Sequence, residues 1–189
     1  AMNSIGWMFE KGNGVEQDYA RAMEWYKKAA ELGYPEAMNS IGWMFEKGNG
    51  VEQDYARAME WFKKAAELGY PEAMTAIGWM FEKGNGVEQD YARAMEWFKK
   101  AAELGYPEAM TVIGWKFEEG NGVEQDYTRA MEWYKKAAEL GYPEAMNNIG
   151  WMFYDGNGVE QDYARAMEWF KKAAELGLPV AMHNIGWMF

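Results

Sequence analysis

Apolar and polar positions alternate along this chain with a helical period, and the whole pattern returns every 36 residues. Within residues 37–45, Ala37, Ile41 and Phe45 fall on one side of a helical wheel, opposite a polar side. A wider apolar side with the same spacing follows in residues 55–68. The pattern therefore predicts two amphipathic helices in each 36-residue unit.

The stretches around these helices carry start and stop signals. The first helix of the second unit is expected to open near Pro35, since a proline needs no hydrogen-bond partner in a first turn. It should stop before Gly48, which can adopt the positive φ of a helix end. Asp54 is placed to cap the second helix. The residues assigned to this recurring framework are Gly42, Gly48, Gly50, Asp54, Gly69 and Pro71.

The spacing divides the chain into five full units and the start of a sixth. The units are residues 1–36, 37–72, 73–108, 109–144 and 145–180, and residues 181–189 hold only a first helix. In the five full copies, 27 of the 36 columns are identical. A fixed period of this length is typical of a solenoid, in which each unit buries its apolar side against its neighbours. We therefore expect one all-α solenoid domain over residues 1–189.

The helical wheel also predicts the core. Ala37, Ile41 and Phe45 should be buried on the first helix, with Gly42 allowing a close approach between helices. The apolar side of the second helix, expected to lie in the core, holds Tyr55, Ala58, Met59, Trp61, Phe62, Ala65, Ala66 and Leu68.

These motifs resemble the Sel1-like repeat, a relative of the tetratricopeptide repeat. The residues that carry the resemblance in the second unit are Ala37, Ile41, Gly42, Phe45, Gly48, Gly50, Val51, Asp54, Lys64, Ala65, Ala66 and Gly69. The resemblance implies a right-handed α/α superhelix with the first helices on its concave side. It also implies a non-catalytic adaptor that binds peptides or protein partners. One bacterial branch of the family is stapled by cysteines and associated with β-lactam binding, a role that does not transfer to this cysteine-free chain.

Charge and composition narrow the choice of partners. The formal net charge of −11 argues against a nucleic-acid partner, which would need clustered Lys and Arg, and favours basic or neutral partners. The absence of cysteine removes disulfides and thiolate metal sites and leaves the compartment undetermined. The longest apolar runs are a few residues long, so we expect a soluble chain without a membrane insertion.

Candidate catalytic and metal motifs are better explained as structure. The Gly12-Asn13-Gly14 loop neither follows a predicted strand nor precedes Lys-Ser or Lys-Thr, as a phosphate loop would. A calcium loop is excluded at residues 155–159, where Val159 occupies a ligand position. His183 is the single histidine. It has neither a nucleophile nor metal-ligand partners in the sequence, so we expect it on the surface. We predict no catalytic, cofactor-binding or metal site, and no enzyme.

Variation between the copies points to a different kind of surface. Nine columns differ, and five of them lie on the first helix, where four surround a tryptophan on the polar side. The fifth, in which Lys116 replaces Met44, is expected at the core boundary. The tryptophan recurs as Trp7, Trp43, Trp79, Trp115, Trp151 and Trp187, which predicts an aromatic ladder along the first helices.

Corresponding positions carry ligand contacts in the tetratricopeptide relatives. The residues expected to line a peptide groove here are Asn39, Trp43, Thr75, Trp79, Glu82, Lys83, Thr111, Trp115, Glu118, Glu119, Asn147, Trp151, Tyr154 and Asp155. We expect a bound peptide to place apolar groups against the tryptophans and basic residues near Glu118, Glu119 and Asp155.

Two alternatives stay open at this stage. The variable columns can reflect neutral drift after duplication, because Thr128, Leu178, Val180 and the exchange of Tyr26 for Phe62 lie outside the predicted groove. The chain can also be a ligand-free, consensus-like or engineered scaffold that stacks end to end through uncapped termini.

Overall fold

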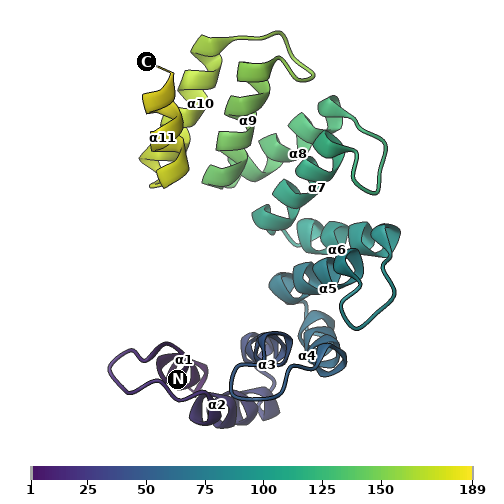
Figure 1. Ribbon diagram of the computed structural model, residues 1–189, viewed down its shortest axis with the longest axis vertical. Helices are drawn as coiled ribbons and strands as arrows, with labels where there is room; N and C mark the ends of the chain where they lie inside the picture. The colour runs from purple at the N-terminus through teal and green to yellow at the C-terminus, as the bar shows by residue number, and fades with distance from the viewer. Residues whose placement is uncertain (1, 189) are drawn as a thin grey trace. The chain divides into compact units, whose positions relative to one another are not determined.

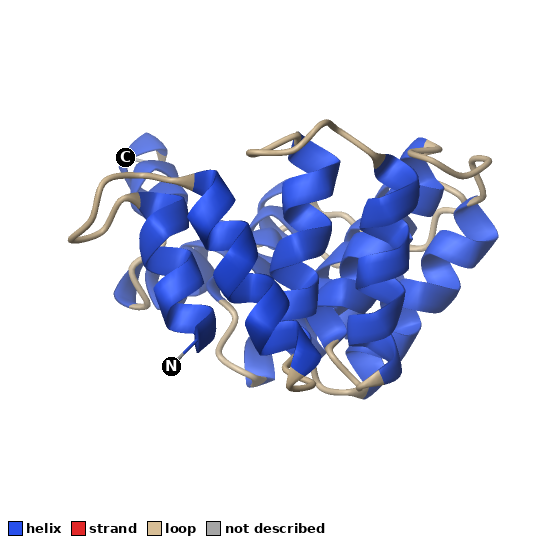
Figure 2. Ribbon diagram, turned by 90° about the horizontal axis from the view of Figure 1, so that it is seen from below, coloured by secondary structure: helices blue, strands red, loops and turns tan. Residues whose placement is uncertain are grey.

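The computed structural model describes residues 2–188, and every regular element in that range is an α-helix (Figures 1 and 2). Ala1 and Phe189, the outer limits of the predicted solenoid, lie outside the described residues. Contacts divide the chain into two compact parts, residues 1–104 and residues 105–189, which are called unit 1 and unit 2 from here on. Each 36-residue segment of the sequence analysis is called a repeat. The organisation of both units as one domain stays a prediction.

Each repeat consists of two helices, here called the A helix and the B helix. The A helices are α1 (Met2–Lys11), α3 (Pro35–Lys47), α5 (Pro71–Lys83), α7 (Pro107–Glu119), α9 (Pro143–Asp155) and α11 (Pro179–Trp187). The B helices are α2 (Tyr19–Glu31), α4 (Tyr55–Glu67), α6 (Tyr91–Glu103), α8 (Tyr127–Glu139) and α10 (Tyr163–Glu175). Each B helix packs on the A helix of its own repeat, and α2, α4, α8 and α10 also pack on the A helix that follows (Figure 1). The predicted all-α solenoid of 36-residue repeats is confirmed.

The glycine-rich loop satisfies the backbone groups that the end of an A helix leaves free. After α3, the Gly48 backbone has φ 71°, and the Asn49 N–H donates to the Met44 carbonyl at 3.0 Å. The Asp54 N–H donates to the Phe45 carbonyl at 2.9 Å. The Gln53 side chain completes the set by donating to the Glu46 carbonyl at 2.7 Å. The loop therefore has a structural role as the connection between the two helices of a repeat, as the sequence predicts.

Asp54 then caps α4. Its side chain accepts a hydrogen bond from the Arg57 N–H at 3.0 Å, and its second oxygen lies 3.3 Å from Arg57 Nε. The equivalent aspartates cap the other B helices. Gly50, with φ 69°, lies against the preceding repeat, where an added Cβ would be 2.4 Å from the Tyr19 Cβ. The cap thus begins the B helix of its own repeat, and the loop packs against the repeat before it.

The predicted core is confirmed in its main part. Ala37 and Ile41 are fully buried on α3, as is Phe62 on α4. Gly42 allows the close approach expected of it, because an added Cβ would lie 2.5 Å from the Phe62 ring. The same glycine–aromatic contact recurs at Gly6, Gly78, Gly114 and Gly150.

Four predicted burials are corrected. Tyr55 is half-buried rather than enclosed, and its hydroxyl accepts a hydrogen bond from the Gln53 side chain at 3.0 Å. Leu68 is 53% exposed, because it follows the last residue of α4 and lies beyond the packed face. Trp61 is half-buried rather than enclosed, and the Lys64 ammonium lies 4.1 Å from its ring centroid in a cation–π contact. Lys116 is only 2% exposed, so its column belongs to the core rather than to its boundary.

No helix within residues 2–188 combines the length and hydrophobicity required to cross a bilayer.

Candidate functional site: the tryptophan face of the A helices

The tryptophans of the A helices lie between core and solvent. Trp7 is 48% exposed and Trp115 is 38% exposed, whereas Trp43, Trp79 and Trp151 are half-buried. The half-buried rings meet the aromatic ring of their own B helix edge to face; Trp43 and Phe62, for example, are 5.3 Å apart at 73°. One edge of each indole is therefore fixed, and part of the ring stays accessible. We call this side of the A helices the tryptophan face.

In unit 1 a lysine accompanies each half-buried tryptophan. The Lys47 ammonium is 5.2 Å from the Trp43 ring centroid, and the Lys83 ammonium is 5.8 Å from that of Trp79. Both lysines are exposed at the C-terminal ends of α3 and α5. The lysine column, one of the four variable columns around the tryptophan, therefore lies beside the indole ring in these two repeats.

A pocket of about 400 Å³ opens on this face between α1 and α3. Its lining consists of Trp7, Glu10, Lys11, Gln17, Tyr19, Ser40, Trp43, Met44, Lys47 and Asn49. Two tryptophans of successive A helices therefore share one cavity with two lysines and a carboxylate. Such convergence of aromatic and polar groups is typical of ligand sites.

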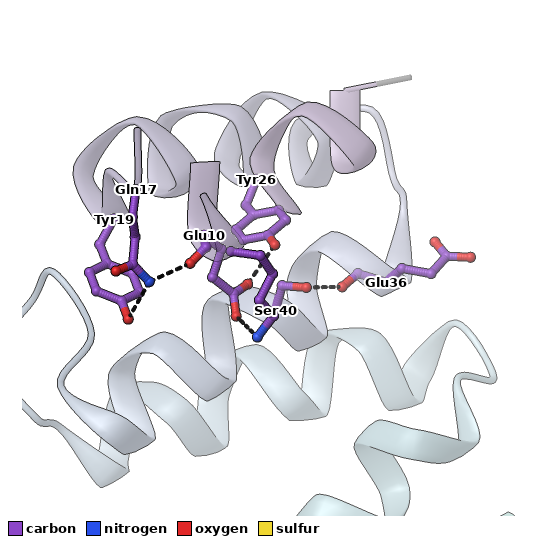
Figure 3. Close-up of polar contacts among 7 residues, drawn as sticks. Glu10, Gln17, Tyr19, Tyr26, Glu36 and Ser40 are labelled. Atoms are coloured by element: carbon purple, nitrogen blue, oxygen red, sulfur yellow. Dashed lines mark hydrogen bonds and ion pairs between the residues drawn. The ribbon is translucent and has the colours of Figure 1, made fainter. Parts of the chain in front are cut away.

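Glu10, which lines this pocket, is held by hydrogen bonds to both of its carboxylate oxygens (Figure 3). Tyr26 donates to Glu10 Oε2 at 2.7 Å, and the Lys11 ammonium donates to Oε1 at 2.8 Å. Burial raises the pKa of Glu10, but these two hydrogen bonds outweigh it and hold the pKa below its usual range. Gln17 donates to the Glu10 carbonyl and to the Tyr19 hydroxyl, which orders the loop beside it (Figure 3).

In the second repeat the same position has a different environment. Phe62 replaces the tyrosine, and Glu46 Oε2 is buried without a hydrogen-bond partner. Burial raises the pKa of Glu46, although Lys83 and Lys47 oppose the shift. Glu46 thus senses the charge of the lysine in the next repeat as well as that of its own neighbour Lys47.

Unit 2 inverts that charge pattern. Tyr134 donates to Glu118 Oε2 at 2.6 Å, yet the pKa of Glu118 is raised by burial and further by Glu119 and Asp155. Where unit 1 has a lysine, unit 2 has Asp155. Glu118 therefore senses the negative charge of both Glu119 and Asp155, and the expected binding of basic ligand groups near these residues stays a prediction.

Tyr154 replaces the glutamate of the other repeats and forms an aromatic cluster. Its ring lies 5.4 Å from Trp151, 5.0 Å from Tyr163 and 5.3 Å from Trp187. Trp187 is 59% exposed. The fifth repeat and Trp187 of α11 therefore together present a larger aromatic surface than any single tryptophan provides.

Other residues of the predicted groove lie deeper. Asn39, Thr75 and Asn147 are 9%, 4% and 8% exposed, and Thr111 is half-buried. The side-chain amides of Asn147 and Asn184 lie at hydrogen-bond distance, 2.8 Å apart, and link one A helix to the next. The asparagine pair therefore links α9 to α11, whereas the Thr75 and Thr111 hydroxyls donate to the Pro71 and Pro107 carbonyls of their own helices. Glu82 is half-buried, and Lys83, Glu119 and Asp155 are exposed.

One exchange assigned to neutral drift from the sequence reaches the tryptophan face. Tyr26 and Tyr134 occupy the column that holds phenylalanine in the other full repeats. Their rings lie in the core, but their hydroxyl groups bond Glu10 and Glu118. The signal available from sequence was the presence of a hydroxyl on an otherwise invariant aromatic position. A helical wheel gives the side of the helix on which the ring lies. It does not show that the tyrosine hydroxyl extends from the core to the glutamate of the A helix.

No group of three or more His, Asp or Glu within residues 2–188 has an arrangement that could hold a metal ion. His183 is exposed, as expected for a surface residue. The glycine loops serve as helix connections in each full repeat.

The repeat unit matches a known family model. The model described as Sel1 repeat matches residues 1–34, 35–70, 71–106, 107–142 and 143–178. The chain belongs to the Sel1 repeat family. From the second match onward, the model begins each repeat at the proline of the A helix, two residues before the alanine at which the 36-residue segments of the sequence analysis begin. No curated protein matches the chain in sequence.

Solved structures of Sel1 repeat proteins share the fold. A Sel1 repeat protein from Oxalobacter formigenes is 38% identical with a TM-score of 0.89, over 100% of this chain and 77% of that chain. A protective antigen of uropathogenic Escherichia coli with an SLR fold is 37% identical with a TM-score of 0.81. This chain is covered to 99%, but it spans only 40% of the antigen. An immunity protein from Pseudomonas aeruginosa, 24% identical with a TM-score of 0.70 over 95% of this chain and 66% of its own, shows the fold alone.

Proposed function

We propose that this chain is a non-catalytic module that binds protein or peptide partners through the tryptophan face of its A helices. Sel1 repeats are in general modules for protein–protein interaction. The observation that carries the proposal is the recurrence of partly exposed tryptophans on the A helices, of which Trp43, Trp79 and Trp151 are held by an aromatic contact to the B helix of their own repeat. Rigid, partly exposed aromatic rings are enriched among the residues that dominate binding energy.

The two units favour different partner groups. In unit 2, Glu118, Glu119 and Asp155 give the tryptophan face a negative charge, and Tyr154 adds an aromatic surface beside it. A basic peptide side chain placed there gains charge attraction and contact with an aromatic ring. We therefore expect partners of unit 2 to carry Lys or Arg next to an apolar residue.

Peptide display on the intact chain tests this function. The counter-selection uses a Trp79→Ala, Trp115→Ala, Trp151→Ala variant. Its matched control carries Trp97→Ala, Trp133→Ala and Trp169→Ala, which remove half-buried tryptophans of the B helices in the same repeats. Circular dichroism of both variants separates lost binding from lost folding. Peptides that the parent and the control enrich, and the A-helix variant does not, support the proposal. Equal enrichment on all three proteins contradicts it.

A second candidate is self-association without another ligand. Apolar side chains of α1 and α11 are exposed, among them Met2 (37%), Met8 (37%), Val180 (48%) and Met182 (54%). End-to-end contact between copies would cover them. Light scattering at increasing concentration checks this alternative, and a mass that stays at one chain contradicts it.

A further inference from the structure

The pocket between α1 and α3 contains three charged side chains, and two of them satisfy each other. Lys11 and Glu10 are joined at 2.8 Å, and Tyr26 occupies the other oxygen of Glu10 at 2.7 Å (Figure 3). Both oxygens of the carboxylate therefore already accept a hydrogen bond from a neighbouring side chain. The charge that the pocket can offer to a ligand comes from the third side chain, Lys47.

Lys47 is exposed, and no carboxylate within residues 2–188 lies at ion-pair distance from its ammonium. Its ammonium is instead 5.2 Å from the Trp43 ring centroid. Glu10 and Glu46 sense the charge of Lys47 electrostatically, but neither contacts it. A lysine held beside an indole retains its hydrogen-bond donors for another acceptor.

We propose that this pocket is a carboxylate-binding subsite, in which Lys47 pairs with a ligand carboxylate while Trp7 and Trp43 contact the apolar atoms next to it. Asn49 lines the same cavity and adds a polar residue beside Lys47, whereas the Ser40 hydroxyl is already donated to the Glu36 carbonyl at 3.0 Å. The subsite rests on the proposed function and adds to it the chemistry that unit 1 selects. Acidic side chains and the C-terminal carboxylate of a peptide present the same group and are the two sources of such a ligand.

The column that contains Lys47 supplies an internal comparison. The fourth and fifth repeats have Glu119 and Asp155 at this position. A carboxylate ligand is repelled there, so the anion preference belongs to unit 1 and the cation preference to unit 2. The opposed charges also explain why Lys47 is exchanged while Trp43 is invariant: the aromatic contact is common to the repeats, and the charge sets what each one accepts.

The test titrates the intact chain with three capped dipeptide probes. They are acetyl-Leu-Glu-amide, acetyl-Leu-Gln-amide and acetyl-Leu-Gln with a free C-terminal carboxylate. Binding is followed by NMR through the indole N–H signals of Trp7 and Trp43, which single Trp→Phe variants assign. The first two probes compare a carboxylate with an isosteric amide, and the third separates a C-terminal from a side-chain carboxylate.

Two variants locate the effect. Lys47→Gln removes the proposed partner, and Lys28→Gln is the matched control, because Lys28 lies 4.5 Å from the Trp25 ring centroid on α2, outside the pocket. We expect a carboxylate probe to bind the parent and the Lys28→Gln variant alike, and to bind the Lys47→Gln variant roughly tenfold more weakly. The amide probe should bind all three proteins equally weakly.

Equal affinity for the carboxylate and amide probes overturns the subsite, as does binding that Lys47→Gln leaves unchanged. Absence of a saturable shift with every probe overturns it too. Peptide display on the tryptophan variants reports on the proposed function separately. If display depends on the A-helix tryptophans but the probes show no dependence on Lys47, the module binds peptides and the carboxylate subsite is wrong.

Discussion

Tyr134 donates a 2.6 Å hydrogen bond to Glu118, and this contact links the core of the fourth repeat to its tryptophan face. The same bond joins Tyr26 to Glu10 at 2.7 Å in the first repeat. In the second repeat Phe62 lacks the hydroxyl, and Glu46 Oε2 is buried without a partner. The residue in the Tyr26 column, tyrosine or phenylalanine, therefore determines whether the glutamate of the same repeat accepts a hydrogen bond from the B helix.

Exchanging tyrosine and phenylalanine in this column should change the free energy of unfolding in opposite directions in the fourth and second repeats. Tyr134→Phe leaves Glu118 without its donor and should cost about 1 kcal/mol. Phe62→Tyr gives Glu46 the donor it lacks and should stabilise by up to about 1 kcal/mol. Urea-unfolding midpoints of the two variants and the parent measure both effects. Shifts of the same sign in both variants would show that the hydroxyl acts through packing rather than through the glutamate.

A second pair of variants tests the contact between the helices of one repeat. Gly42→Ala places a Cβ 2.5 Å from the Phe62 ring and should destabilise by roughly 1–3 kcal/mol through overpacking. Gly186 occupies the equivalent place on α11, where an added Cβ meets nothing within 4 Å. Gly186→Ala should therefore be neutral or should stabilise by up to about 1 kcal/mol through helix propensity. Thermal unfolding of both variants checks the contrast, which disappears if Phe62 can move aside freely.

The helices and their connections could be predicted from sequence because local chemistry specifies them. Pro35, Gly48 and Asp54 each act within a few residues of their own position, and each does in the structure what its residue type indicates. The period of 36 residues then extends one repeat to the whole chain.

Burial was harder to predict, because it depends on the neighbouring repeat. A helical wheel gives the side of a helix but not how far the next helix covers it. Asn147 lies on the polar side of its wheel, yet it is 8% exposed because Asn184 of the following A helix packs against it. Leu68 shows the opposite error, because the helical wheel predicted burial and the side chain is exposed. The predicted helix included Leu68, but α4 ends at Glu67 and Leu68 lies beyond the packed face.

The buried amide pair of Asn147 and Asn184 gives a third prediction. Asn184→Ala leaves the Asn147 amide without this partner and should cost roughly 1–3 kcal/mol. Asn147→Ala should cost a similar amount for the same reason. The double variant should cost much less than the sum, because no unpaired amide remains. A double-mutant cycle on urea-unfolding free energies measures the coupling, and additive effects would show that the pair contributes nothing as a pair.

Opposite pKa shifts at equivalent glutamates give the last prediction. Glu10 and Glu118 occupy the same column, yet the pKa of Glu10 is lowered and that of Glu118 is raised from 4.5. A lowered pKa contributes stability above pH 4.5 that is lost as the pH falls through the folded-state pKa. A raised pKa contributes stability below pH 4.5 that is lost as the pH rises through the folded-state pKa.

The charge-removing variants should therefore differ in sign at neutral pH. Glu10→Gln loses the ion pair with Lys11 and should destabilise at pH 7, whereas Glu118→Gln should stabilise, because it keeps an acceptor for Tyr134 and removes repulsion from neighbouring carboxylates. Both effects should amount to about 0.3–1 kcal/mol, since these side chains are partly exposed, and should shrink toward pH 4. Glu24→Gln, at an exposed position on α2, measures the general effect of removing one acid from a chain of net charge −11. Urea-unfolding midpoints between pH 4 and pH 7.5 follow all three variants. If Glu10→Gln and Glu118→Gln both track Glu24→Gln, net charge rather than local environment governs these glutamates, and the contrast between the two units of the tryptophan face loses its electrostatic basis.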